Sequence, residues 1–325
     1  MHRRTLLAAA AAAAVAGTAP LARAQQSYPD QLIKWIVPYP AGGGTDVIAR
    51  TLAEAMRGPL GQQIVIDNRP GASTNIGADL VAKSRPDGYT IMSADNAVLA
   101  FNEFLFSKLP FNPERDFSYI GAIGRFPLAL VVHPDFPARD LKAFLAYVRA
   151  NPGKVNYASP GNGSPHHLAM EMFKNRTGTF ITHIPYRGAA PAMSDVMGGQ
   201  VPCMFLDLAS GLQIMQSGKV RALAIGSAQR SRLLPDVPTL AEAGVRDSEV
   251  FAFQGVLGPA GLPPAVVARL NGELNKAFGT AAVQKRFTDI GMEALAGTPE
   301  QFHQLARAEA RRWGPVIKAT GVRLD

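Results

Sequence analysis

Short apolar runs alternate with helical patterns along most of this chain. The runs that read as strands lie at residues 33–37, 64–66, 89–92, 128–132, 155–157, 181–184, 201–205, 220–225 and 250–257. Helical patterns separate many of them: Ile48, Leu52 and Met56 recur at four-residue spacing, and Gly58-Pro59 is expected to end that helix. Strands that alternate with helices predict α/β layers with largely parallel sheets.

The C-terminal part reads as helical throughout. Apolar residues at four-residue spacing over residues 266–278 predict one helix beyond Pro264. A last helix is expected to begin at Pro299, with Thr298 as its N-cap and Gln301 completing a capping box.

The N-terminus has the pattern of an export signal. Arg3-Arg4 precedes an alanine-rich apolar run over residues 6–16, and Ala22-Arg23-Ala24 fits the small-x-small cleavage pattern. Residues 1–24 therefore predict a signal peptide that is cleaved after Ala24 and directs the protein to the periplasm. The run is too short and too weakly hydrophobic to span a membrane. Export by the Sec route and by the twin-arginine route both remain open.

Composition fits an exported two-domain protein. The 325 residues leave roughly 300 after removal of the signal, enough for two domains of ordinary size. The formal net charge of +8 falls to +5 when Arg3, Arg4 and Arg23 are removed. A basic surface favours anionic partners, but no basic run interleaved with aromatic residues indicates nucleic-acid binding. Cys203 is the only cysteine, so no intrachain disulfide can form, and we expect it to be buried in a strand.

A glycine-rich turn after the first strand predicts an anion site. Residues 38–46 read Pro-Tyr-Pro-Ala-Gly-Gly-Gly-Thr-Asp and open a helix. The start of a helix leaves backbone N–H groups free and carries the positive end of the helix dipole, which suits an anion. The run is neither a Walker loop nor a GxGxxG dinucleotide motif.

A second turn has the same character. Residues 157–168 again join a short strand to a helix, with Ser164 suited to the N-cap and Pro165 to the first helical position. Ser159 and Asn162 add neutral hydrogen-bonding groups. If two domains face each other, both helix starts can point at one small molecule with an acidic group at either end. The alternative is two unrelated capped helices.

Histidines near these turns raise two other hypotheses. His166 and His167 with Asp207 or His183 would suggest a metal site, but adjacent helical residues point about 100° apart and no HxxxH or CxxC spacing is present. Ser164 near His167 would suggest a hydrolase, but no GxSxG elbow is present. We therefore expect no bound metal, no cofactor and no catalytic residue.

For each of two charged residues, Asp207 and Arg187, the sequence allows both a ligand-binding role and a structural role. Asp207 follows a strand at the end where α/β sheets place ligands, so it could accept a hydrogen bond from an amine or hydroxyl, or it could cap a helix. Arg187 could pair with a ligand carboxylate or form a surface ion pair.

Several segments together resemble a known family. The chain resembles the Bug family of extracytoplasmic solute receptors of tripartite tricarboxylate transporters (TctC-like) over essentially its whole mature length. The matching segments, in order, are residues 35–46, 67–71, 75–77, 86–90, 185–188 and 236–240. One departure concerns the residues after Gly71, where the family usually has glycines and this chain has Ala72-Ser73-Thr74.

The resemblance implies a type II periplasmic-binding-protein fold with two α/β domains. The first domain would hold residues 25–125 plus 250–325, and the second residues 126–249. Residues 128–132 and 250–257 are well placed as the two crossing strands. Proteins of this fold close around a ligand by hinge motion.

The resemblance also implies the ligand class and the site. Relatives bind small mono- or dicarboxylates, often through bridging waters, and hand them to membrane permease subunits. A ligand-sensing role toward a signalling partner remains an alternative, as does a periplasmic hydrolase, and we expect a monomer. The residues expected to bind ligand are Tyr39, Ala41, Gly42, Gly43, Thr45, Asp46, Ser73, Ser159, Gly161, Asn162, Gly163, Ser164, His167 and Asp207.

Overall fold

The computed structural model describes residues 28–325. The predicted signal peptide and its cleavage site lie outside these residues. None of the helices in the described range combines the length and the apolar character that a membrane crossing requires.

The strands of the described range form a single mixed sheet. Its order is β2-β1-β3-β9-β4-β7-β5-β6, and β8 and β10 also pair with β4. The strands are β1 (Ile33–Val37), β2 (Ile64–Asn68), β3 (Thr90–Asp95), β4 (Phe117–Val132), β5 (Asn156–Ser159), β6 (Thr182–Pro185), β7 (Cys203–Asp207), β8 (Arg221–Ile225), β9 (Phe251–Pro259) and β10 (Glu293–Ala294).

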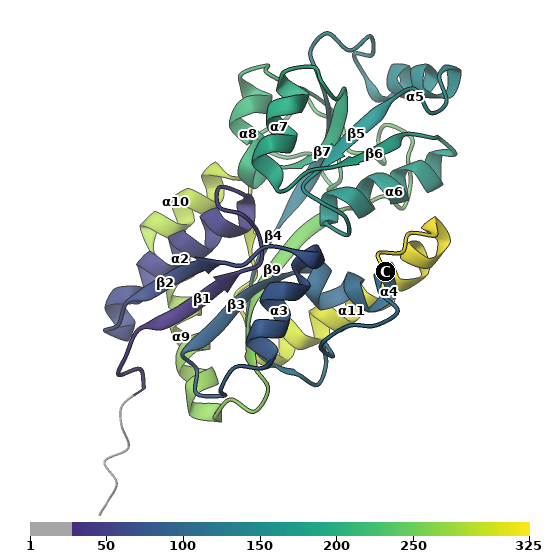
Figure 1. The fold of residues 1–325 in the computed structure, drawn as a ribbon. Helices are drawn as coiled ribbons and strands as arrows, with labels where there is room; N and C mark the ends of the chain where they lie inside the picture. The colour runs from purple at the N-terminus through teal and green to yellow at the C-terminus, as the bar shows by residue number, and fades with distance from the viewer. Residues whose placement is uncertain (1–27) are drawn as a thin grey trace, which may run out of the picture.

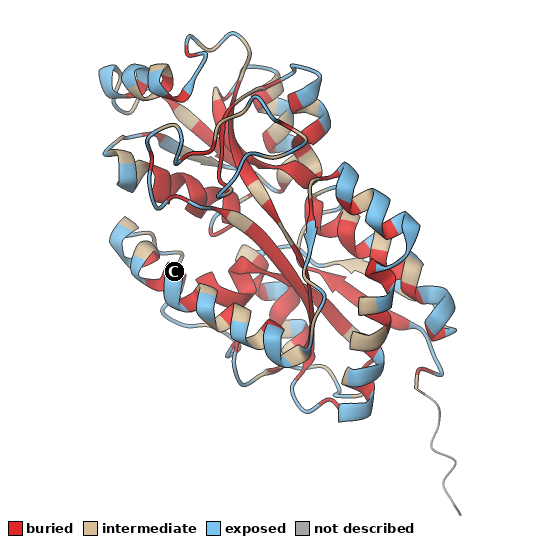
Figure 2. Ribbon diagram, turned by 180° about the vertical axis from the view of Figure 1, so that it is seen from behind, coloured by how far each residue is buried: buried red, intermediate tan, exposed pale blue. Residues whose placement is uncertain are grey.

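Helices cover both faces of this sheet (Figure 1). They are α2 (Gly44–Leu60), η1 (Ala72–Thr74), α3 (Asn75–Ala82), η2 (Ala97–Phe101), α4 (Asn102–Leu105), α5 (Leu141–Ala150), α6 (Pro165–Thr177), α7 (Ala189–Met197), α8 (Leu208–Gln216), α9 (Pro264–Phe278), α10 (Ala281–Asp289) and α11 (Pro299–Thr320). Figure 2 shows the buried residues along the central strands and on the inner helix faces, while the outer faces are exposed.

The sheet divides into two lobes that share β4. The first lobe contains β2, β1, β3 and β9 with residues 117–127 of β4, and the second contains β7, β5, β6 and β8 with residues 128–132 of β4. At the junction the Gly226 amide donates to the Leu128 carbonyl (2.8 Å), and the Leu128 amide donates to the Val250 carbonyl (3.3 Å). Backbone hydrogen bonds therefore join the two crossings between the lobes.

Each expected strand is present, but the expectation of largely parallel pairing is wrong at the centre. The pairs β1–β2, β1–β3, β5–β6 and β5–β7 are parallel, whereas β4 pairs antiparallel with β7, β8, β9 and β10. The sequence also predicted only residues 128–132 of β4, because Gly121, Gly124 and Pro127 break the apolar run that precedes them.

The expected helix ends are mostly observed. Thr298 and Gln301 form the predicted capping box of α11. The expectation that Gly58-Pro59 ends the first helix is wrong by one residue: α2 continues past Pro59 to Leu60, and its C-cap is Gly61, whose φ is +71°. Proline removes only its own N–H, and the Gly61 amide closes the turn by donating to the carbonyls of Arg57 and Gly58.

Close packing of α11 on β9 makes one glycine sensitive to substitution. A Cβ added to Gly255 would lie 2.0 Å from Cζ of the buried Phe302. Gly255→Ala is therefore expected to lower the free energy of unfolding by about 1–3 kcal/mol, the usual cost of overpacking a core. Urea unfolding of both proteins measures the difference.

Gly272→Ala is the matched control for this change. Gly272 lies inside α9, and an added Cβ would meet nothing within 4 Å. The same substitution should raise the stability there by about 0.5–1 kcal/mol, because alanine favours helix. Equal effects at the two positions would contradict the packing argument.

Candidate functional site

A cleft of about 860 Å³ separates the two lobes at their glycine turns. Five segments line it: residues 38–40, 70–74, 160–164, 185–188 and 323–325. The first and second turns predicted from the sequence thus face the same space from different lobes. The C-terminal residues close one end, where the Leu324 amide donates to the Leu105 carbonyl (2.9 Å) beside α4 (Figure 1).

The first turn leaves the start of α2 without a side-chain cap. Gly43 is the N-cap residue and makes no capping hydrogen bond, so the first amides of α2 have no partner within the helix. Gly43 and Thr45 line a narrow extension of the cleft described below. Ala41 and Gly42 are exposed and lie outside the lining of both spaces.

Asp46 stabilises this turn from inside. Its carboxylate accepts from the Gly42 amide (3.0 Å), from Arg50 Nε (3.0 Å) and from Asn68 Nδ2 (3.0 Å). Burial by itself would raise the pKa of Asp46, but these hydrogen bonds outweigh it and hold the pKa below its usual value. Asp46 therefore shapes the glycine turn and does not line the cleft.

The second turn presents Gly161, Asn162, Gly163 and Ser164 to the cleft. Ser164 is the N-cap of α6, as expected, and its Oγ accepts from the His167 amide (3.3 Å). The Gly163 amide is not free, because it donates to Nδ1 of His167 (3.0 Å). Asn162 makes no side-chain hydrogen bond with the described residues, so its amide group is available to a ligand.

Ser159 and His167 lie beneath this turn, outside the cleft lining. The rings of His167 and His183 stack with centroids 4.0 Å apart, and His183 stacks on Tyr157 at 4.7 Å. Burial lowers the pKa of His167 to about 4 and that of His183 to about 3, so both rings are neutral at pH 7. Ser159 Oγ lies 2.6 Å from His183 Nε2, but Ser159 is fully buried and a ligand in the cleft does not reach it.

The neutral histidine pair predicts a loss of stability in acid. Between pH 6.5 and about 4 the unfolded chain binds protons on His167 and His183, whereas the folded protein does not. The free energy of unfolding should have its full value above pH 6.5. At lower pH it should decrease by at most about 1.4 kcal/mol per pH unit for each histidine. His183→Phe should show a shallower decline in urea unfolding at pH 6.5, 5.5 and 4.5. Parallel declines would refute this account.

The loop after Gly71 is strained. Ala72, Ser73 and Thr74 have φ values of +46°, +52° and +77°, a region that favours glycine. Asn102 holds the loop by donating to the Ser73 carbonyl (2.8 Å). Ser73 lines the cleft opposite the second turn: a Cβ placed on Gly163 would lie 3.6 Å from the Cβ of Ser73.

Relief of this strain should be measurable. Ser73→Gly removes the cost of a left-handed conformation, about 1–2 kcal/mol, and this stabilises the folded protein. It also gives the unfolded chain more conformational entropy, which lowers the stability by about 0.4–1 kcal/mol. The net result should be a rise in stability of roughly 0.5–1 kcal/mol. Ser84→Gly is the control, since Ser84 has an ordinary negative φ and should lose stability. Thermal melts compare the melting temperatures of both variants with that of the parent. A lower melting temperature for Ser73→Gly would contradict the claim that the loop is strained.

A narrow extension of about 40 Å³ continues from the cleft between the lobes, and we call it the inner pocket. The two spaces share Tyr39, Pro40, Pro160 and Gly188. The rest of the lining is Gly43, Gly44, Thr45, Asp95, Phe126, Pro165, His166, Ala189, Asp207, Ala252 and Gln254. The start of α2 thus forms one wall, and residues of the second lobe form the opposite wall.

Asp207 is the N-cap of α8, one of the two roles considered for it, and accepts from the Ser210 amide (2.7 Å). It also lines the inner pocket, where its bond to a ligand amine or hydroxyl stays a prediction. Its Oδ2 pairs with His166 Nε2 (2.9 Å). Burial by itself would raise the pKa of Asp207, but the hydrogen bonds from His166 and Ser210 hold it below its usual value, so the carboxylate is ionised. Across the pocket Tyr39 donates to Asp95 Oδ2 (2.7 Å).

The set of ligand contacts expected from the sequence leaves out most of the inner-pocket lining, including the polar residues Asp95, His166 and Gln254. Two signals were present. Asp95 ends a buried strand, where α/β sheets place ligands. Gln254 is the single polar residue in the otherwise apolar β9. His166 had been considered only as a metal ligand, and within residues 28–325 no group of three or more His, Cys, Asp or Glu side chains could hold a metal ion.

Two cations lie at the cleft. Arg187 is exposed and forms no ion pair with any residue in the described range, and Arg323 donates to the Phe104 carbonyl (3.1 Å). Asp325 also lines the cleft and places a carboxylate beside these two cations.

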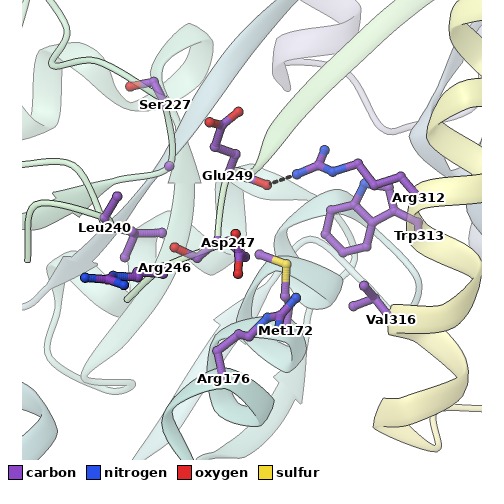
Figure 3. Close-up of a pocket in the computed structure, with 13 residues that line it drawn as sticks. Met172, Arg176, Ser227, Leu240, Arg246, Asp247, Glu249, Arg312, Trp313 and Val316 are labelled. Atoms are coloured by element: carbon purple, nitrogen blue, oxygen red, sulfur yellow. Dashed lines mark hydrogen bonds between the residues drawn. The ribbon is translucent and has the colours of Figure 1, made fainter. Parts of the chain in front are cut away.

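A separate cavity of about 570 Å³ lies between α6, α11 and residues 226–249 (Figure 3). Arg176, Arg246 and Arg312 line it, but so do Asp247 and Glu249. Arg312 donates to the Glu249 carbonyl (2.5 Å), which joins α11 to the segment before β9.

Comparison with known proteins identifies the family. Residues 48–322 match the model described as "Tripartite tricarboxylate transporter family receptor". Protein BugT of Bordetella pertussis is 38% identical over 299 residues, which cover 92% of each chain.

Solved structures agree with this. The periplasmic binding protein BugD is 34% identical with a TM-score of 0.87, covering 91% of this chain and 99% of BugD. An R. palustris protein solved with adipate is 34% identical (TM-score 0.87; 90% and 98% covered). MatC of Rhodopseudomonas palustris, solved with malate, is 32% identical (TM-score 0.85; 89% and 100% covered). The predicted fold and family resemblance are confirmed: the chain belongs to the tripartite tricarboxylate transporter receptor family of periplasmic solute-binding proteins.

Proposed function

We propose that this receptor captures a small organic dicarboxylate in the cleft between its lobes. The observation that carries the proposal is the uncapped start of α2, which opens into a space lined by both lobes. Free amides and the helix dipole stabilise a carboxylate there. The adipate and malate bound by the two structural relatives support the same ligand class.

The proposed contacts differ from the full set expected from the sequence. Tyr39, Gly43 and Thr45 would meet the ligand at the inner pocket, and Ser73, Gly161, Asn162, Gly163 and Ser164 in the wider cleft. Arg187 would pair with a second carboxylate. Ala41, Gly42, Asp46, Ser159 and His167 would act behind these residues by shaping the two turns.

Hinge closure would complete the site. We place the domains at residues 25–125 plus 250–325 and at residues 126–249, with the hinge where Leu128, Gly226 and Val250 exchange hydrogen bonds. Both crossings lie side by side (Figure 1). Rotation about two adjacent strands would open the cleft while each half of the sheet keeps its pairing.

The remaining assignments follow from the family. The mature protein, cleaved after Ala24, would work in the periplasm as a monomer without enzymatic activity. It would deliver its ligand to the permease subunits of a tripartite tricarboxylate transporter. A sensor protein as partner is the alternative, and a pull-down of the ligand-bound receptor with candidate membrane proteins separates the two.

A bulky side chain between the lobes should prevent capture. A Cβ on Gly44 would lie 3.1 Å from Asp207 Oδ1 and 3.4 Å from the Ala209 Cβ, both in the opposite lobe. Gly44→Leu should therefore hold the lobes apart and weaken binding of the best dicarboxylate at least tenfold in isothermal titration calorimetry. Gly58→Leu, on the same helix with nothing within 4 Å, should bind as the parent does.

Each protein must first give a cooperative thermal melt. If Gly44→Leu folds and binds as tightly as the parent, the ligand does not lie between the lobes. If no dicarboxylate in a panel that includes malate, succinate and adipate shifts the melting temperature of the parent, the proposed ligand class is wrong.

A further inference from the structure

Residues 322–325 reach from one lobe toward the other at one end of the cleft, and we call them the clasp. They follow Gly321, which ends α11. Hydrogen bonds join them to residues 104–107 at the end of α4; the Leu324 amide, for example, donates to the Leu105 carbonyl (2.9 Å). Because α4 lies between β3 and β4 in the chain and packs against α11, these bonds fix the clasp to the first lobe.

The side chain of Leu324 contacts the second lobe. A Cβ placed on Gly163 would lie 2.9 Å from Leu324 Cδ1 and 3.1 Å from Leu105 Cδ1. Gly163 belongs to the second turn, which follows β5 in the second lobe. Two leucine side chains held on the first lobe therefore pack against the backbone of the second, and this apolar contact exists only while the lobes are close together.

This contact is separate from the inner pocket and from the hinge. None of residues 322–325 lines the inner pocket. Figure 1 shows the clasp end of the chain beside α4 and below α6, away from the crossing of β4 and β9. Rotation about the hinge separates groups most where they lie far from it, so opening of the cleft pulls Leu324 away from Gly163. The half-buried Leu324 side chain would then meet water.

We propose that the clasp, through Leu324, stabilises the closed arrangement of the lobes and sets the ratio of closed to open protein in the absence of ligand. Burial of part of a leucine side chain is enough to change such a two-state equilibrium about tenfold. A larger closed fraction raises the apparent affinity for every ligand that the closed cleft holds, so Leu324 acts as a positioning residue. The inference goes beyond the proposed function, because it concerns the equilibrium between the lobes and not the identity of the ligand.

Leu324→Ala and Leu324→Gln test the clasp by the separation of the lobes. Spin labels at Arg85→Cys in the first lobe and Lys142→Cys in the second, both at exposed positions, report this separation by pulsed electron double resonance. Cys203 is fully buried and stays unlabelled. With no ligand added, the ratio of closed to open protein should be about tenfold lower in each variant than in the labelled parent. The parent itself should have mainly the separation found in this structure.

Leu80→Ala is the matched control, since Leu80 is a partly exposed leucine on α3, inside the first lobe. It should keep the parent's distribution of distances. Titration calorimetry with malate, succinate and adipate gives a second measurement. The Leu324 variants should weaken the binding of every ligand that the parent binds by one common factor, at most about tenfold, and keep the order of affinities.

Thermal melts first establish that each variant folds. An unchanged distance distribution in a folded Leu324 variant would overturn the inference, and so would an equal change in Leu80→Ala or a parent that is mostly open. A changed order of affinities would also overturn it, because Leu324 would then act on the ligand directly. If no dicarboxylate binds the parent, the proposed function fails, while the distances measured without ligand still decide whether the clasp holds the lobes together.

Discussion

The passage of β4 from one lobe to the other is the constraint on which the rest of the molecule depends. Residues 117–127 of β4 pair with β9, and residues 128–132 pair with β7 and β8. One continuous strand thus belongs to both halves of the sheet. Because its hydrogen bonds change partners at Leu128, each half of the sheet keeps its own pairing.

The two glycine turns serve the cleft in different ways. The first turn keeps the amides of α2 free, because Gly43 has no capping side chain and Asp46 is engaged with Arg50 and Asn68. The second turn satisfies its own groups through Ser164 and His167. The two lobes therefore contribute differently: the first offers the uncapped start of α2, and the second offers Asn162 and the wall that carries His166.

Buried polar groups near the cleft differ in whether they are satisfied. His167, His183 and Ser159 form a closed network beneath the second turn, and such a network makes the turn rigid. His166 and Gln254 each use one polar atom on a protein partner and leave the other free. The first group supports the shape of the site, and the second leaves hydrogen-bonding capacity for a ligand.

The sequence by itself determined the features that depend on near neighbours in the chain. The helix starts at Gly44, Pro165 and Pro299, with caps at Ser164 and Thr298, were predicted because an N-cap involves residues within four positions of one another. The apolar runs likewise located every strand except β10 and the first part of β4. The ordered set of short motifs identified the family and with it the fold.

Only the tertiary structure decided which of these groups a ligand can reach. The sequence suggests that the Gly163 amide is free, but in the structure this amide donates to Nδ1 of His167. His166 is hydrogen-bonded to Asp207, 41 residues away in the sequence, and Gln254 is hydrogen-bonded to Thr45, 209 residues away. Such pairs form when separate elements pack, and no local pattern records them. The sequence therefore located the two glycine turns that line the cleft and the inner pocket, while packing between distant segments decided which polar atoms there remain unpaired.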